Sequence, residues 1–383
     1  MPPVPRRSFD VVHDRVRKIL VTGGAGFIGA NFVRYWLREH PDDRVVVLDA
    51  LTYSGNLENL EPLHDCPGFH FVRGDIRDAG LVAKIFAEEQ IDTVVHFAAE
   101  SHVDRSIYAP DAFLSTNVLG THELLKAAVA TWGRQADPGR YRFHHVSTDE
   151  VYGTLRPNDP AFAEGTPYAP NSPYAASKAA SDHMVRAYHH TYGLPVTTTN
   201  CSNNFGPLQF PEKLVPLMIV NALDGKPLPV YGDGRQVRDW LYVEDHCRGI
   251  EAVLERGVVG ETYNLGGNCE RANIDVVRGV CHALDQAFER DPSLTLRFPR
   301  SSAARGDRSE SLIAYVTDRP GHDRRYAIDA SKAAREVGYC VRSRFEEALQ
   351  ATVAWYIENE PLWRRVTDGS YRNWIAEHYR GAV

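Results

Sequence analysis

A tyrosine and a lysine four residues apart are the first candidates for chemistry in this sequence. Tyr174 and Lys178 lie in the run Tyr-Ala-Ala-Ser-Lys, and in a helix over residues 174–188 their side chains share one face. A tyrosine has an ordinary pKa of about 10, so it becomes a base only where a cation favours its phenolate. The pair predicts a proton acceptor for a substrate hydroxyl, although alone such residues are more often ordinary packed side chains.

Two adjacent carboxyl groups form a second candidate group. Thr148, Asp149 and Glu150 follow an apolar run over residues 143–147, which is typical of a buried strand. Two carboxyl groups in one pocket tend to separate their pKa values, so that one donates a proton while the other accepts one. Thr148 is placed to hold the same substrate oxygen as the tyrosine. The plain alternative is a surface turn with solvated acids.

Three glycines at a spacing of three residues indicate a phosphate-binding turn. Gly23, Gly26 and Gly29 follow an apolar strand and open an apolar helical pattern, whose first amides and dipole suit a diphosphate. The next strand, residues 44–48, ends in Asp49, where a carboxylate can accept hydrogen bonds from ribose hydroxyls. Because this carboxylate repels a ribose phosphate, the sequence predicts NAD and not NADP.

Alternating strands and helices predict the fold that positions these groups. The alternation is typical of an α/β doubly wound parallel sheet of the Rossmann type, with ligands beyond the carboxyl ends of its strands. The composition then changes beyond Pro207, which predicts a smaller, interleaved substrate-binding lobe. The predicted units are a flexible leader (1–17), an NAD-binding domain (18–200, with 243–262 packing back on it), a substrate-binding lobe (201–242 and 263–345), a mobile surface loop (300–311) and a helical C-terminal segment (346–383).

The composition narrows the function classes. The chain has 383 residues and a formal net charge of −7, which argues against general nucleic-acid binding. No apolar run approaches the roughly 20 residues that span a bilayer, and the basic opening lacks the apolar core of a secretion signal. Six cysteines contain no Cys-x-x-Cys pair, which favours free thiols in a reducing compartment. A cytoplasmic enzyme is expected, and no metal site is predicted.

Taken together, the glycine turn and the Tyr174/Lys178 pair resemble the extended short-chain dehydrogenase/reductase superfamily. Within it, the sequence is similar to the dTDP-glucose 4,6-dehydratase family from about Lys18 to near the C-terminus. One departure is Phe205, where the family commonly has tyrosine. The motifs that carry the resemblance are residues 22–29, 51–57, 96–106, 147–153, 172–183, 200–207, 238–246 and 318–323.

The resemblance implies a role for each candidate catalytic residue. Tyr174, supported by Lys178 and Thr148, would deprotonate the 4-hydroxyl of a nucleotide-bound glucose while hydride passes to NAD. Glu150 would then remove the hydrogen at carbon 5, and Asp149 would protonate the departing hydroxyl at carbon 6. Return of the hydride to carbon 6 gives the 4-keto-6-deoxy sugar, so NAD is regenerated and should stay bound.

Two sets of binding residues and a partner follow from the sequence and the resemblance. The cofactor set is Gly23, Gly26, Phe27, Ile28, Gly29, Asp49, Leu51, Thr52, Asp75, Ile76, Ala98, Ala99, Ser101, Thr116, Tyr174, Lys178 and Asn204. The substrate set is Ser101, Thr148, Asn203, Lys213, Leu214, Pro229, Tyr231, Arg238, Asn273, Arg319, His322 and Tyr326. The resemblance also implies a homodimer through helices over residues 117–130 and 174–188, with Ala179, Met184 and Ala187 facing outward.

Three other functions remain open at this point. A sugar-nucleotide 4-epimerase would share the fold, NAD and the Tyr174/Lys178 pair, but it has no use for Asp149 and Glu150. A decarboxylase of nucleotide glucuronates would need a basic group for the substrate carboxylate, and none is identifiable. A catalytically silent dinucleotide sensor would not need the intact catalytic groups. The choice between thymine and uracil depends on the shape of the pocket, which the sequence leaves open.

Overall fold

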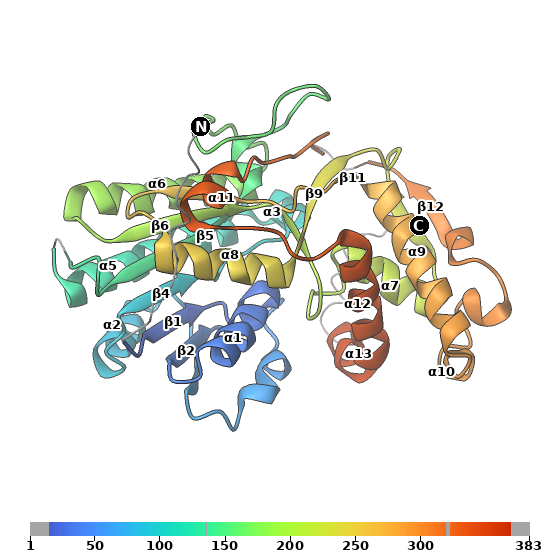
Figure 1. Cartoon of the computed structure of the whole chain (residues 1–383), viewed down its shortest axis with the longest axis horizontal. Helices are drawn as coiled ribbons and strands as arrows, with labels where there is room; N and C mark the ends of the chain where they lie inside the picture. Colours follow the sequence, from blue (N-terminus) through green and yellow to red (C-terminus); the bar gives the residue numbers. More distant parts are fainter. Residues whose placement is uncertain (1–14, 135, 319–321, 369–383) are drawn as a thin grey trace, which may run out of the picture.

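A seven-stranded parallel sheet forms the larger of two lobes in the computed structural model, which describes residues 15–134, 136–318 and 322–368 (Figure 1). Its strand order is β10-β6-β5-β4-β1-β2-β3, as the predicted doubly wound fold requires. Most of the predicted leader, Arg319 and the last part of the C-terminal segment lie outside the described residues. The strands are β1 Lys18–Thr22, β2 Arg44–Asp49, β3 Phe69–Arg73, β4 Thr93–His96, β5 Arg142–Thr148, β6 Val196–Cys201 and β10 Thr262–Leu265.

Helices cover both faces of this sheet because its strands are apolar on both sides. On one face, alternate residues of β1 and β2 pack against α1 (Phe27–Glu39) and α8 (Val243–Arg256). The residues between them face α2 (Ala79–Glu88), α5 (Thr121–Trp132) and α6 (Pro173–Tyr192) on the other face. The strand order reverses between β1 and β4, so a crevice for ligands is expected at their carboxyl ends.

The smaller lobe has its own apolar core and lies beside the carboxyl ends of the sheet (Figure 1). Helix α9 (Asn273–Arg290) packs against both α7 (Leu214–Leu223) and α12 (Phe345–Glu358), while α13 (Glu360–Asp368) follows α12. No helix in the described part of the chain combines the length and the apolar character that crossing a bilayer requires. The strands of this lobe are β7 Asn203–Phe205, β8 Leu228–Tyr231, β9 Val237–Tyr242, β11 Glu270–Ala272 and β12 Ile313–Val316.

The chain crosses between the lobes more often than the predicted boundaries allow. Strand β10 pairs in parallel with β6, and α11 (Ser331–Val337) packs against α8 and β10. Both segments therefore lie on the larger lobe, although most of their residues were predicted in the smaller one. Strand β10 covers the edge of β6 that would otherwise be unpaired, and this is the physical reason for the return.

The segment over residues 300–311, predicted as a mobile surface loop, lies largely at the surface but is attached to α9. The segment contains two short 3₁₀ turns, Ala303–Arg305 and Ser309–Leu312. The amide and hydroxyl of Ser309 donate to Asp285 of α9 at 3.1 and 2.6 Å, and the Ser309 side chain is buried. Small, polar and charged residues are typical of a loose loop, whereas here the serine side chain attaches the segment to a helix.

The outward face predicted for α6 also needs correction. Ala179 is buried in the chain's own core beside Val151 and Phe162, so it is not available to a partner. Met184 is partly buried and packs against the core on the α2–α5–α6 face of the sheet, and only Ala187 is exposed. Because many residues of α6 are buried, the spacing of its small residues could not show which face of the helix is exposed.

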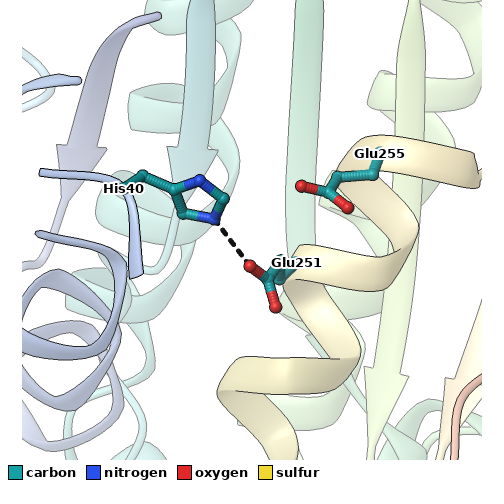
Figure 2. Close-up of side chains that lie close together, drawn as sticks. All are labelled: His40, Glu251 and Glu255. Atoms are coloured by element: carbon teal, nitrogen blue, oxygen red, sulfur yellow. Dashed lines mark hydrogen bonds and ion pairs between the residues drawn. The ribbon is translucent and has the colours of Figure 1, made fainter. Parts of the chain in front are cut away.

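Helices α1 and α8 are joined by a cluster of titratable side chains, shown in Figure 2. The Nε2 atom of His40, just after α1, lies 2.6 Å from one carboxylate oxygen of Glu251, and Tyr35 donates to the other oxygen. The ligand atoms of His40, Glu251 and Glu255 lie within 4.8 Å of one another, as in a metal site. Since both oxygens of Glu251 are already bonded and Arg256 lies 3.3 Å from Glu255, we interpret the cluster as an ion-paired contact between helices.

Candidate active site

One cavity of about 1260 Å³ lies between the two lobes. It is larger than the roughly 300–1,000 Å³ of most small-molecule sites. Its wall contains the glycine turn and the carboxyl ends of β1, β2, β4 and β5 on one side. Residues of α7, β8, β9 and α13 form the other side, so the cavity is large enough for two ligands that meet between the lobes.

The glycine turn meets the geometric requirements of a diphosphate site. Gly23 has a φ of +70°, and a Cβ there would come within 2.6 Å of the amide nitrogen of Ala98. A Cβ on Gly29 would collide with the carbonyl oxygen of Gly23. A Cβ on Gly26 would meet only that same oxygen, at 3.4 Å, and Gly26 lines the cavity. The backbone therefore faces the cavity at the N-terminus of α1, where free amides and the helix dipole suit phosphate oxygens.

Asp49 is held in position for a ribose. Its two carboxylate oxygens accept hydrogen bonds from the amides of Ala25 at 2.9 Å and Leu51 at 2.8 Å. Burial raises the pKa of Asp49, and these two hydrogen bonds oppose that rise. Each oxygen keeps a second lone pair, and Asp49 lines the cavity, which fits the ribose hydroxyls of a dinucleotide. Leu51 itself packs against the core and is not part of the cavity wall, so its role is to orient Asp49.

The structure brings the rest of the predicted cofactor set to this cavity. Asn204 is fixed there by His246, whose Nδ1 lies 3.0 Å from its side-chain oxygen. The other members that line the cavity are Phe27, Ile28, Thr52, Asp75, Ile76, Ala98, Ala99, Ser101 and Thr116.

Helix α6 carries Tyr174 and Lys178 into the middle of the cavity. The helix begins at Pro173, and the hydroxyl of Ser172 accepts a hydrogen bond from the amide of Ala175 at 3.1 Å. This cap places Tyr174 in the first turn, where burial and then Glu150 raise its pKa well above the ordinary value. A hydrogen bond with Thr148 opposes this rise. The chain's own residues therefore hold Tyr174 as a phenol, so a base requires a further positive charge.

The two carboxyl groups differ in environment, as the sequence predicts. Asp149 and Glu150 begin a 3₁₀ turn (Asp149–Tyr152) at the end of β5. Asp149 is 2% exposed, and burial followed by the charges of Glu150 and Asp239 raises its pKa well above the ordinary value. Its Oδ2 atom has no hydrogen-bond partner among the described residues. Burial thus favours the protonated form of Asp149, against the opposing influence of Arg238, beside a half-buried glutamate, and the two carboxyl groups are a candidate donor and acceptor pair.

Arg238 provides a positive charge in the cavity wall, close enough to Asp149 to lower the pKa of that carboxyl group. It is 4% exposed, and its guanidinium donates to the carbonyl oxygens of Val237 at 2.8 Å and Asp323 at 2.9 Å. The ring of Tyr326 lies 4.3 Å from the guanidinium carbon, a cation–π contact. Tyr326 was predicted to touch the substrate, but it lies outside the cavity wall. It instead supports Arg238, which lines the cavity.

Other predicted substrate residues also line the cavity. The carboxamide oxygen of Asn203 is buried and has no hydrogen-bond partner in the described part of the chain, which suits a ligand hydroxyl. The Nζ atom of Lys213 donates to the carbonyl oxygen of Ser101 at 3.2 Å and so crosses the cleft. The remaining members in the wall are Leu214, Pro229, Tyr231, Asn273 and His322, whereas Arg319 lies outside the described residues.

The sequence analysis missed one buried ionisable pair in the wall. The Nε2 atom of His102, in the loop after β4, lies 3.3 Å from Glu212, which precedes α7. Burial raises the pKa of Glu212 to about 8. The two residues are distant in the sequence, and only the closure of the smaller lobe on the sheet brings them together. One feature of the sequence pointed to Glu212: it precedes Lys213, which was predicted to contact the substrate.

Comparisons with known proteins show the family of this chain. The family model described as GDP-mannose 4,6 dehydratase matches residues 20–352. A dTDP-glucose 4,6-dehydratase of Xanthomonas campestris pv. campestris (strain B100) is 58% identical over 355 residues, which are 92% of this chain and 97% of that protein.

Solved structures give the same family. A dTDP-glucose 4,6-dehydratase of Streptomyces venezuelae, solved with NAD and TYD bound, has a TM-score of 0.80 and 47% identity and covers 91% of this chain and 99% of its own. A UDP-glucose 4-epimerase of Thermotoga maritima, solved with UDP-glucose, has a TM-score of 0.75 but only 26% identity, covering 89% and 99%. With a family model over most of its length and a relative more than half identical, the chain belongs to the dTDP-glucose 4,6-dehydratase family.

Proposed function

We propose that this protein is an NAD-dependent lyase that converts dTDP-glucose to the 4-keto-6-deoxy sugar nucleotide. The observation that carries the proposal is the neutral Asp149 beside Glu150, facing the same cavity as Tyr174. Relatives named for this reaction, one of them solved with NAD, support it. The glycine turn and Asp49 would hold the cofactor, which when bound accepts hydride from carbon 4 of the sugar and returns it to carbon 6.

Tyr174 is the proton acceptor of the oxidation. It takes the proton of the 4-hydroxyl, with the Thr148 hydroxyl in hydrogen-bond contact to hold the same oxygen. Lys178 contributes a buried positive charge one turn along α6, where its Nζ atom donates to the carbonyl oxygen of Val146 at 2.8 Å. The neighbouring positive charge of the bound cofactor would lower the pKa of Tyr174 further and so make it a base.

Asp149 and Glu150 carry out the elimination. A ketone at carbon 4 acidifies the hydrogen at carbon 5, and Glu150 accepts that proton. The electron pair left at carbon 5 forms a double bond to carbon 6 as the hydroxyl there leaves. Asp149, which is neutral because of its burial, donates its proton to this hydroxyl, so water departs.

The smaller lobe binds the nucleotide diphosphate. Arg238, whose guanidinium is fixed by two backbone carbonyls, and Arg319 supply the charge for phosphate oxygens. The other proposed contacts come from Asn203, Lys213, Tyr231, Asn273 and His322. Thymine is the proposed base because the relatives are named for dTDP-glucose. The free cysteines in the structure suit a reducing compartment, so we place the enzyme in the cytoplasm.

The first prediction tests the reaction itself. Purified protein mixed with dTDP-glucose and no added NAD should give a product lighter by one water, because the cofactor is restored in each turnover and stays bound. UDP-glucose serves as the comparison substrate, and mass analysis of the quenched sugar nucleotides is the measurement. An isomer of unchanged mass would indicate an epimerase, and unaltered substrate would indicate a sensor.

We also propose that the enzyme is a homodimer. Exposed apolar side chains gather on α3 (Val103–Tyr108) and on the π-helical turn Leu114–Gly120, both of which contact α6. Ile107 is 41% exposed, and the values for Tyr108, Leu114 and Leu119 are 66%, 54% and 58%. Contiguous apolar surface of this kind marks an interaction site, and it continues the α5–α6 face that the resemblance implies.

The second prediction follows from this surface. The parent protein should sediment with the mass of two chains at micromolar concentration, and Leu114→Glu should shift it toward one chain by placing a charge in the interface. Leu296→Glu is the matched control, because Leu296 is 87% exposed on the other lobe and should leave the mass unchanged. Sedimentation of the parent as a single chain would overturn the dimer.

A further inference from the structure

Asp182 lies under the active site without touching the cavity. It is one helical turn beyond Lys178 on α6 and is 6% exposed. One carboxylate oxygen accepts from Nε2 of His145 at 3.0 Å. The other accepts from the hydroxyls of Ser147 at 2.8 Å and Tyr168 at 3.0 Å. Three donors from strand β5 and from the loop before α6 therefore converge on one buried carboxylate.

The charge states of the groups around Asp182 are set by burial. Burial lowers the pKa of His145 well below its usual value, so this ring is neutral and donates through Nε2. Burial likewise raises the pKa values of Tyr168 and Tyr152, which remain phenols. Among the groups that face Asp182, Lys178 lowers its pKa most, followed by the hydrogen bonds from Ser147 and Tyr168. His183, also on α6, has a smaller effect in the same direction.

Lys178 and Asp182 each oppose the effect of burial on the other's pKa. Burial lowers the pKa of Lys178, and Asp182 is the leading influence that opposes this. Burial raises the pKa of Asp182 to about 6, and Lys178 is the leading influence against it. The two side chains lie at i and i+4 of one helix in an environment of low dielectric, so each favours the charged form of the other.

We propose that Asp182 is a positioning residue for the catalytic pair, which keeps Lys178 charged and in place beneath Tyr174. Tyr174, Lys178 and Asp182 follow one another at intervals of four residues, so they form one stripe along α6. The hydrogen bonds from β5 fix the lower end of this stripe, and the bond from Lys178 to Val146 fixes its middle on the same strand. The inference rests on the proposed roles of Tyr174 and Lys178.

The third prediction uses Asp182→Asn. This change keeps the size of the side chain, and His145, Ser147 and Tyr168 can exchange donor and acceptor roles to preserve the network, so chiefly the charge is lost. We expect kcat to fall by about 10- to 100-fold with little change in KM, because Lys178 loses the carboxylate that favours its charged form while the binding residues remain. Asp43→Asn is the matched control, since Asp43 is a buried carboxylate far from the cavity that accepts from Trp36 and Arg17.

Two readouts separate a positioning role from a structural one. The parent should lose kcat as the pH falls through about 6, where Asp182 gains a proton, and Asp182→Asn should lack this step. Independently of turnover, the pH dependence of Lys178 labelling by acetic anhydride, read by mass spectrometry, should shift to lower pH in Asp182→Asn. Labelling and pH profiles equal to those of Asp43→Asn would overturn the inference. An inactive parent would contradict the proposed function instead, and the labelling would still decide the role of Asp182.

Discussion

Replacing Glu150 with glutamine should stop dehydration while leaving oxidation at carbon 4 intact. Glutamine keeps the size of the side chain and its hydrogen-bonding reach, but it cannot accept the proton from carbon 5. Loss of a general base typically slows a reaction by about 10²- to 10⁴-fold. Because Tyr174, Lys178 and Thr148 are unchanged, the sugar should still be oxidised, and the reaction should stop at that stage.

A single-turnover experiment distinguishes the two steps. The absorbance of reduced nicotinamide should rise after mixing with dTDP-glucose and persist, while mass analysis of the quenched sugar shows almost no loss of water. Glu88→Gln, a change at an exposed position of α2, should match the parent in both measurements. Dehydrated product at nearly the parent rate from Glu150→Gln would show that another group removes the proton.

The acid pair also explains why the dehydratase assignment is stronger than the epimerase alternative. Epimerisation needs only removal and return of hydride at carbon 4, for which Tyr174 and its neighbours suffice. A carboxyl group kept neutral by burial beside a second carboxyl group destabilises the protein and is of no use to that reaction. The pair has a use once a proton must leave one carbon and another must reach a departing hydroxyl.

Much of the fold could be predicted because local patterns determined it. The short apolar runs became β1 to β6, and the glycine turn adopted the close approach to Ala98 that only glycine permits. The pairing of β10 with β6 had no comparable signal, because the chain passes through the smaller lobe between these two strands. The burial of Ala179 was likewise invisible, since its spacing on α6 fits an inner or an outer face equally well.

The same distinction between local patterns and long-range contacts applies to the candidate site. Residues at the ends of predicted strands, such as Asp49 and Asp149, could be placed because parallel strands end at one edge of the sheet. The contact of His102 with Glu212 could not, because it joins two lobes. Asp182 was also missed, since its role depends on hydrogen bonds from β5 that no helical spacing reveals.

Replacing Tyr174 with phenylalanine should have the opposite signature to Glu150→Gln. The phenylalanine ring can keep the edge-to-face contact with Phe113, at 6.3 Å between ring centroids, so α6 should stay in place. Without the hydroxyl, no group takes the proton from the 4-hydroxyl, and oxidation should slow by about 10²- to 10⁴-fold. Neither reduced-nicotinamide absorbance nor loss of water should then appear in a single turnover.

The pH dependence gives a second test of the same residue. Because burial raises the pKa of Tyr174, its base form becomes more populated as the pH rises, so the parent's oxidation rate should climb with pH. The residual rate of Tyr174→Phe should lack this climb. Tyr188→Phe is the matched control on the same helix, where the lost hydroxyl lies 3.1 Å from Nδ1 of His122. If Tyr174→Phe oxidised the sugar at the parent rate and with the parent's pH profile, another group would have to accept the proton. Thr148 would then be the first candidate, because it shares a hydrogen bond with Tyr174.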